Sequence, residues 1–450
     1  MPTPVVTAPA TPAPQTSPAS DAAAVAIVEP EPPLRPDFTV GVHAFLRAAT
    51  RVNSDFGRGD AQDVSQVLQR VRLTGTAKLG AASAFVQLQD NRVWGFETST
   101  ASNSGNTDLH QGYFHVAGQN NSGTVSGFIR GGRQEIAYGR QRLVGSLGWA
   151  PTGRSFNALR LHGQAGAISA DAFVAVLKPM GTVSGPGTTP DEPEQRQSSG
   201  AQLYSFQLGA SPHKAFAAEV TTLYNVEDAR DGDLGWTRSI GNVGAHVFGS
   251  PLASLRYDGE FNYQFGDNNG RDHQAWAGAA HVNYLATTGR VRFGGGGGYT
   301  IASGEACSDS PEQGCGAADS TEFFNFYPTN HGIYGIVDLF GWRNMRDAEV
   351  SAKLVVPKKL AFTVAYHFFQ LHEAAGRWSN AGGATVGAGW DPDNNDHTLG
   401  HEIDLILRYT PFEKFFVEPG YAVFMPTQAG NTLGGDDPQH FAYIWAIANF

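Results

Sequence analysis

Apolar and polar side chains alternate in short segments along most of the chain, most clearly over residues 252–265. Leucine and aromatic residues occupy one parity of this segment: Leu255, Tyr257, Phe261, Tyr263 and Phe265. The other parity is polar throughout and carries three charges: Arg256, Asp258, Glu260, Asn262 and Gln264. Because successive side chains of a β-strand point to opposite faces, the pattern predicts a strand with one apolar and one charged face. Such a strand is typical of a membrane barrel with a watery lumen.

Weaker copies of this pattern recur every 15 to 25 residues, between clusters of Gly, Asn, Asp, Pro and Ser. Four of them lie at residues 38–48, 67–73, 360–368 and 401–409. About 18 segments can be recognised, each near the ~10 residues that a tilted transmembrane strand needs. We therefore expect an all-β fold, a single closed antiparallel transmembrane β-barrel of about 18 strands. A soluble propeller or double sandwich is the alternative, but it does not require charged rows opposite aromatic rows.

The end of the chain supports the membrane interpretation. Residues 441–450 form a ten-residue alternating segment that ends on Phe450. A terminal aromatic after such a strand resembles the signal by which outer-membrane barrels are recognised for insertion, although Ala448 makes the match partial. The partners expected on this basis are outer-membrane lipid and the barrel-assembly machinery.

The first 36 residues differ in composition from the rest. Ten prolines and few large apolar residues predict that 1–36 is a disordered Pro/Ala-rich linker and that 37–450 is one barrel domain. The chain opens on Met1 without the basic and apolar regions of a signal peptide. Either such a signal has been removed and the numbering restarted, or the start codon is mis-assigned.

Composition agrees with a barrel and excludes other classes. Charged residues make up 16 % of the chain, against ~25 % in typical domains, and Gly accounts for 55 residues, which disfavours long exposed helices. The net charge of −11 argues against a nucleic-acid partner. The chain contains no apolar run of ~18 residues, so no transmembrane helix is predicted.

Two cysteines are present, Cys307 and Cys315, separated by seven residues in a Gly/Ser/Asp-rich segment. A close pair in a loop predicts a disulfide in an oxidising compartment. Free thiols or a metal pair are the alternatives, but no His lies between them. Neither metal-ligand spacing nor a nucleophile motif appears elsewhere, so we expect no metal, no cofactor and no enzymatic activity.

Positive charge concentrates at residues 126–162, which hold six Arg and one Glu. Arg133 shares a strand parity with Glu135, and Arg160 shares one with His162. Arginine binds carboxylates through a fixed planar fork, so a row of arginines in a lumen attracts anions. Internal pairing, for example of Arg133 with Glu135 or Asp258, is an equally open interpretation of any one residue.

The same segment resembles the alginate-export family of outer-membrane β-barrels, through its GRQE…YG…RLVG…GRSF…ALRL pattern. Three further stretches carry the resemblance: VQLQDNRVWG at 86–95, FYPTNHGIYGIVDLF at 326–340, and residues 399–426 beginning LGHEID. The resemblance implies an 18-stranded barrel whose arginine-rich lumen passes an anionic polysaccharide. It also implies lumen candidates: Arg92, Arg133, Arg142, Arg154 and Arg160, with Glu135 and Asp338 as acidic partners.

Two functions follow as expectations. One is a channel of the bacterial outer membrane that passes an alginate-like anionic polysaccharide or related anionic solute by diffusion, with periplasmic secretion components as further partners. The other is a general porin for small solutes.

Overall fold

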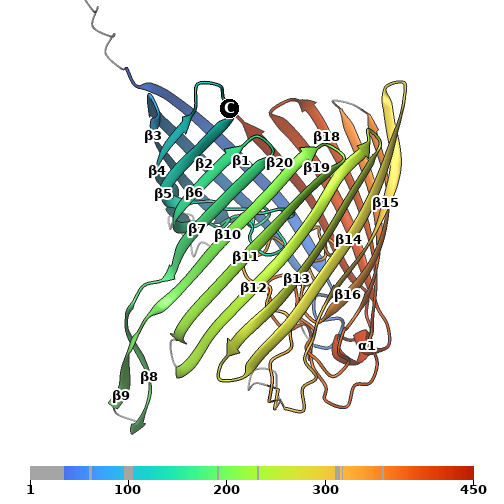
Figure 1. The fold of residues 1–450 in the computed structure, drawn as a ribbon. Helices are drawn as coiled ribbons and strands as arrows, with labels where there is room; N and C mark the ends of the chain where they lie inside the picture. The colour runs from blue at the N-terminus through green and yellow to red at the C-terminus, as the bar shows by residue number, and fades with distance from the viewer. Residues whose placement is uncertain are drawn as a thin grey trace, which may run out of the picture. The chain divides into compact units, whose positions relative to one another are not determined.

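The computed structural model describes residues 35–59, 63–95, 105–189, 192–230, 233–309, 315–316, 318–356 and 359–450. Most of the predicted 1–36 linker therefore lies outside the described residues. The described chain forms one large barrel (Figure 1). Among these residues, none of the helices has the length and apolar character to cross a membrane.

Eighteen strands build the barrel. They are β1 (Asp37–Val52), β2 (Val64–Leu79), β3 (Ala82–Val93), β4 (Asn106–Gln119), β5 (Val125–Gln134), β6 (Phe156–Ala165), β7 (Ile168–Lys178), β10 (Gly200–His213), β11 (Phe216–Arg230), β12 (Asp233–Leu252), β13 (Leu255–Asn268), β14 (Asp272–Thr288), β15 (Val291–Ala302), β16 (Met345–Val356), β17 (Leu360–Gln370), β18 (Thr398–Phe412), β19 (Phe415–Pro426) and β20 (Gln439–Asn449). A separate hairpin consists of β8 (Gly181–Thr189) and β9 (Glu192–Ser198), and α1 spans Ala429–Leu433.

The barrel is an antiparallel meander that closes on itself. Each barrel strand pairs with the next one along the chain, and β7 pairs with β10 across the β8–β9 hairpin. Closure comes from β1, which pairs with β2 on one side and β20 on the other. The prediction of a closed antiparallel barrel of about 18 strands is confirmed.

The predicted alternation also matches the two faces of the wall. On β13, Phe261 and Phe265 are about half exposed, at 52 % and 48 %, while Asn262 and Gln264 between them are buried. The same holds on β2, where Leu73 is exposed and Arg72 is buried. The outer face is therefore an apolar band suited to lipid, and polar residues such as Arg72, Asn262 and Gln264 point inward.

The two ends of the barrel differ in their connections. At one end, which we call the turn end, strands are joined by two-residue turns such as 166–167 and 214–215. The last residue, Phe450, lies at this end (Figure 1). The other end, the loop end, has long connections at 135–155, 303–344 and 371–397.

These long loops fold into the barrel and form its core. Val144 of one loop and Tyr327 of another are joined by a parallel β-bridge. Trp342 and Trp378 are fully buried, and the ring of Phe340 stacks on Phe369 of β17 at 3.7 Å between centroids. The loop half of the lumen is thus packed with apolar side chains, and open space remains mainly toward the turn end.

Candidate functional site: a cationic vestibule at the turn end of the lumen

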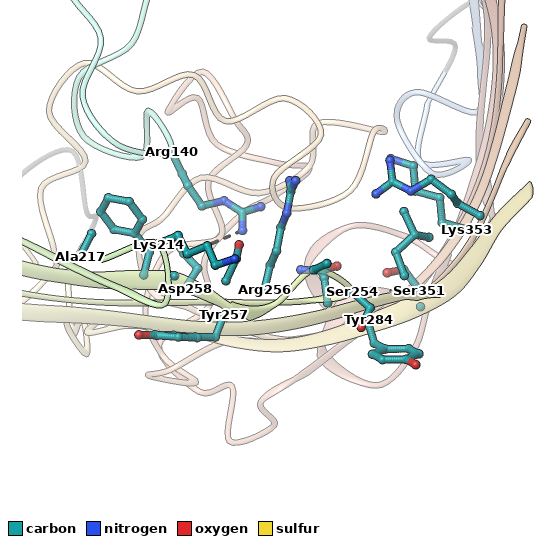
Figure 2. Close-up of a pocket in the computed structure, with 18 of the residues that line it drawn as sticks. Arg140, Lys214, Ala217, Ser254, Arg256, Tyr257, Asp258, Tyr284, Ser351 and Lys353 are labelled. Carbon is teal, nitrogen blue, oxygen red and sulfur yellow. Dashed lines mark ion pairs between the residues drawn. The ribbon is translucent and has the colours of Figure 1, made fainter. Parts of the chain in front are cut away.

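A cavity of about 970 Å³ lies in the turn half of the lumen. Its walls come from β10–β17 and from their turns at 214–215 and 253–254. Arg140 and Gly332, from two of the folded-in loops, close it on the loop side. We call this cavity the vestibule (Figure 2).

Five cationic side chains line the vestibule, against a single carboxylate, Asp258. The cations are Arg140, Lys214, Arg256, Arg292 and Lys353. Strand parity explains the positions of those on strands, since Lys353 precedes the outward-facing Leu354 and therefore points inward. In Figure 2, Arg256 and Lys353 project to the side of the sheet from which the Arg140 loop approaches, and Tyr257 and Tyr284 project to the other.

The one carboxylate is already neutralised by its neighbours. Asp258 lies 3.4 Å from Arg142, 3.6 Å from Arg140 and 2.5 Å from the Nε2 atom of His246. By contrast, none of the described residues forms an ion pair with Lys214, Arg256, Arg292 or Lys353. The vestibule therefore keeps an uncompensated positive charge.

Behind the vestibule, Arg142 fastens loop 135–155 to the barrel wall. Its side chain is fully buried and its Nη1 atom donates to Glu260 at 2.7 Å and to Asp258 at 3.4 Å. Its Nη2 atom is 3.2 Å from the Nδ1 atom of His281. The imidazole of His281 fits against β15 because Gly298 has no side chain there. One arginine thus satisfies two strand carboxylates and fixes the loop in the lumen.

Arg154 holds two loops together rather than lining an open path. Its Nη1 atom donates to the carbonyl of Pro328 at 2.7 Å and also to that of Tyr327. Burial lowers the pKa of this guanidinium from its ordinary value, while the nearby Tyr327 opposes the change. Arg154 is a loop-to-loop contact in this structure.

Two other arginines predicted to face the lumen lie beside carboxylates that were not predicted as their partners. Arg160 forms an ion pair with Asp171 of β7 at 2.9 Å, and Arg92 contacts Asp90 at 2.8 Å. Both arginines thus have carboxylates as neighbours. The corresponding expectation of a continuous row of lumen arginines stays a prediction.

Arg133 points in a different direction from the other candidates. It lies on the same strand parity of β5 as Ile129, which is exposed, and its Nε atom donates to the carbonyl of Leu109. Its neighbours in the adjacent strands, Gly112 and Asn157, belong to the outer face as well. A lumen position for Arg133 is not supported, because the strand keeps its parity to this point.

The predicted acidic partners have partners of their own. Glu135 contacts Arg72 at 3.1 Å and His110 at 2.7 Å, rather than Arg133. Burial alone raises the pKa of Glu135, but the hydrogen bond from His110 and the charge of Arg72 bring it below its ordinary value. Asp338 contacts His331 at 2.8 Å within its own loop.

Sequence reasoning missed the vestibule cations outside the Arg-rich segment. Arg256 was recognised as part of a polar strand face, but Lys214, Arg292 and Lys353 were not singled out. These residues could have been found from the sequence, because each is a Lys or Arg at an inward-facing position of a predicted strand or in the turn next to it. Among the described residues, no cluster of His, Cys, Asp and Glu is arranged to hold a metal ion.

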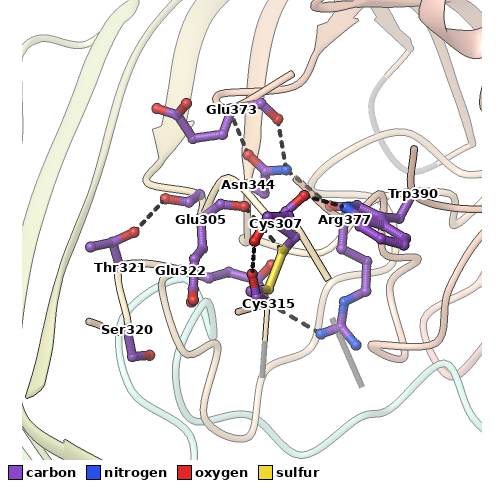
Figure 3. The surroundings of a disulfide bond; sticks show 12 residues. Glu305, Cys307, Cys315, Ser320, Thr321, Glu322, Asn344, Glu373, Arg377 and Trp390 are labelled. Atoms are coloured by element: carbon purple, nitrogen blue, oxygen red, sulfur yellow. Dashed lines mark hydrogen bonds and ion pairs between the residues drawn. A yellow bond between two sulfur atoms is a disulfide. The ribbon is translucent and has the colours of Figure 1, made fainter. Parts of the chain in front are cut away.

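The predicted disulfide is present in loop 303–344. Cys307 and Cys315 are bonded to each other (Figure 3). The bridge is docked on loop 371–397, since the indole Nε1 of Trp390 donates to the carbonyl of Cys307 at 3.1 Å. Nearby, Arg377 of the same loop contacts Glu322 at 3.3 Å. The disulfide lies within loop 303–344, and the Trp390 hydrogen bond and the Arg377–Glu322 ion pair join this loop to loop 371–397.

Comparisons with known proteins agree with this architecture. The model of the family described as "Alginate export" matches residues 37–447. No curated protein sequence matches the chain. Among solved structures, OccAB1 of Acinetobacter baumannii aligns with a TM-score of 0.56 at 12 % identity, covering 92 % of this chain and 96 % of that one. The outer membrane protein OprD of Pseudomonas aeruginosa aligns with a TM-score of 0.53 at 13 % identity, covering 92 % and 93 %. At these identities the structural likeness shows the fold alone.

The protein is thus a multi-pass β-barrel of the bacterial outer membrane that forms a channel. In such barrels the short turns face the periplasm, so the vestibule opens on the periplasmic side. The family match spans the barrel from its first strand to its last, and the chain belongs to the alginate-export family.

Proposed function

We propose that the channel passes anionic solutes, an acidic alginate-like polysaccharide among them, by diffusion through the vestibule. The observation that carries the proposal is the charge of the vestibule: five cationic side chains against one carboxylate that is already paired. The family match supports an acidic polysaccharide as the solute.

The physical argument is electrostatic focusing. A narrow cleft with low-dielectric walls concentrates the field of its charges and raises the local concentration of counter-ions. At physiological ionic strength the Debye length is about 8 Å, so cations spread over one cavity act together on a solute inside it. A polyanion gains more from this field than a single small anion, because several of its charges lie in the field at once.

A general porin for small solutes is the second candidate. The observation that favours it is the plug of folded-in loops, which fills the loop half of the lumen with apolar side chains such as Trp342 and Trp378. A lumen filled in this way leaves less room for a polymer than for a small solute. The two candidates differ in whether an acidic oligosaccharide occupies the channel.

The remaining partners follow from the outer face and the chain end. The exposed apolar rows support contact with outer-membrane lipid. The terminal strand β20 and Phe450 support recognition by the barrel-assembly machinery. Periplasmic secretion components are proposed only from the family match.

Planar-bilayer recording of the purified barrel tests the proposal. Under a KCl gradient we expect a reversal potential that favours chloride, and a preference that shrinks at 1 M salt, where the Debye length is about 3 Å. Uronate oligomers should reduce the current at concentrations at which neutral oligomers do not. A cation-selective or unselective channel would contradict the proposal. An anion-selective channel that uronate oligomers never block would favour the general porin.

A further inference from the structure

A second region of the lumen, away from the vestibule, carries aromatic rings where a polar wall is expected. Inward-facing positions of membrane barrels are usually polar, and the aromatic residues face outward. On four consecutive strands, β3 to β6, the inward parity instead holds a group of rings: Phe85, Tyr113, His115, Phe128 and His162. We call these five residues, together with Arg130, the ring strip.

Strand parity places the ring strip inside the barrel. Phe85 precedes the exposed Val86, and Phe128 precedes the exposed Ile129. Tyr113 and His115 flank Phe114, which is 76 % exposed on the outer face. The strip lies in the turn half of the wall, since Phe128 is only three residues from the start of β5 at Val125.

The rings are in contact across neighbouring strands. Phe85 stacks on Tyr113 with 4.9 Å between centroids and 15° between planes. Phe128 stacks on His162 at 5.1 Å and 21°, and lies 4.9 Å from His115. All five side chains are only partly buried. The strip therefore keeps ring surface facing the lumen.

Arg130 joins the two halves of the strip. Its guanidinium lies 4.4 Å from the centroid of Tyr113 and 5.1 Å from that of Phe128. The Nε atom donates to the Nδ1 atom of His115 at 3.3 Å. Among the described residues, no acceptor or carboxylate is bound by its two terminal nitrogens. A carboxylate on this wall, Asp171, is held by Arg160, by the hydroxyl of Tyr138 and by His162 of the strip.

A hollow of about 410 Å³ lies against the strip. It is lined by Phe128 and His162 together with small and polar side chains of β4 and β5, such as Gln119 and Ser126. This volume is within the range of small-ligand sites, which combine apolar surface with a few polar groups.

We propose that the ring strip is a saccharide-binding site that takes a pyranose ring bearing a carboxylate. The C–H face of a pyranose stacks on an aromatic ring, and its hydroxyls find hydrogen-bond partners at the rim. The carboxylate binds the two terminal nitrogens of Arg130 in two-point fashion, the geometry that suits a guanidinium. The occupant is chosen by this charge complementarity and by the rings. A small inorganic anion would use Arg130 but not the stacked rings.

This inference deepens the proposed function and rests on it for the anionic character of the solute. It adds that recognition depends on ring faces, at a site separate from the vestibule. The two ideas make different demands, because the vestibule acts through long-range charge and the ring strip through contact.

Substitutions at Phe128 and Arg130 test the site by block of channel current in planar bilayers. The probes are a uronate oligomer and a neutral pyranose oligomer of the same length. Phe128→Leu keeps an apolar side chain but removes the flat ring, and Phe128→Tyr keeps the ring. We expect Phe128→Leu to raise the half-blocking concentration of the uronate oligomer by about three- to tenfold, and Phe128→Tyr to leave it nearly unchanged.

Arg130→Gln should weaken block by the uronate oligomer by about tenfold or more while leaving any block by the neutral oligomer unchanged. Ile129→Ala, on the outer face of the same strand, is the matched control and should change neither. Heat-modifiable migration on gels shows that each variant is folded.

Equal effects of Phe128→Leu and Phe128→Tyr, or no effect of Phe128→Leu, would overturn the ring strip as a saccharide site. A wild-type channel that prefers chloride but is never blocked by the uronate oligomer would also overturn it, while leaving the anion preference of the vestibule intact. A wild-type channel that shows no preference for anions would instead overturn the proposed function.

Discussion

Arginines in two regions of this lumen have opposite surroundings. On the folded-in loop 135–155, Arg142 is fully buried and bound to Glu260 and Asp258, and Arg154 is bound to loop carbonyls. On the strands that form the vestibule wall, Arg256 and Arg292 line an open cavity and have no carboxylate partner among the described residues. The same residue type is a structural fastener in one region and a source of free charge in the other.

The difference shows that the pairing of arginines, rather than their number, decides what they do in a channel. In a buried ion pair, the cost of desolvation offsets most of the Coulomb attraction, so the pair adds little net stability. Its main effect is to hold the two side chains in one conformation. An unpaired cation on a cavity wall keeps its field for the solute. Variants in the two regions should therefore fail in different ways.

The largest effect on stability is expected from Arg142→Met. It leaves Asp258 and Glu260, whose side chains are only 14 % exposed, with one partner fewer, and removing one member of a buried pair costs roughly 3–5 kcal/mol. Release of loop 135–155 should also raise the single-channel conductance. Urea unfolding of the detergent-solubilised barrel measures the first effect and bilayer recording the second.

Arg140→Met is the matched control for that variant. Arg140 also contacts Asp258, but at 3.6 Å and with its side chain 41 % exposed, so its loss should cost about 1 kcal/mol or less. Equal destabilisation by the two variants would contradict the fastener role of Arg142.

A smaller effect is expected from the disulfide at the loop end. Replacing Cys307 and Cys315 together by Ser removes the disulfide that closes a short loop. This disulfide stabilises the fold by about 2–3 kcal/mol at most. The change should be local, with faster proteolysis of loop 303–344 and little change in chloride preference. Alkylation of two thiols in the unreduced native protein would show that no bridge forms.

The smallest effect is expected at Glu135. Burial raises the pKa of this carboxyl, but His110 and Arg72 lower it by more, so the folded-state pKa is below the ordinary value of 4.5. A carboxyl with a lowered pKa stabilises the fold above its unfolded pKa, and this contribution is lost as pH falls through the folded pKa. Glu135→Gln should therefore be less stable than wild type at pH 7, with the difference closing below pH 4.5. A difference that stays constant from pH 7 to pH 3 would contradict the assignment.

Local sequence patterns predicted the wall of this molecule well. Alternation on β13 separated Phe261 and Phe265 from Asn262 and Gln264 correctly, because side-chain direction in a strand depends only on parity. The Cys307–Cys315 bridge was predictable for a similar reason, since both ends lie in one short segment.

The interior was harder to predict, because its contacts join residues far apart in the chain. Arg142 meets Glu260 across 118 positions, and Arg154 meets Pro328 across 174. No local pattern indicates that loop 135–155 folds into the lumen, or which carboxylates its arginines contact. The Arg-rich segment therefore could not indicate which arginines pair with carboxylates and which remain unpaired.

The central claim, that unpaired vestibule cations set the selectivity, is tested most directly by reversal potentials under a KCl gradient. The variant Arg256→Gln/Arg292→Gln/Lys353→Gln removes three unpaired cations, and we predict that it loses most of the preference for chloride while migrating as a folded barrel. The control Arg160→Gln/Asp171→Asn removes a neutralised pair of the same lumen and should keep the wild-type reversal potential. A triple variant as anion-selective as wild type, or a control that shifts as far as the triple variant, would contradict the account.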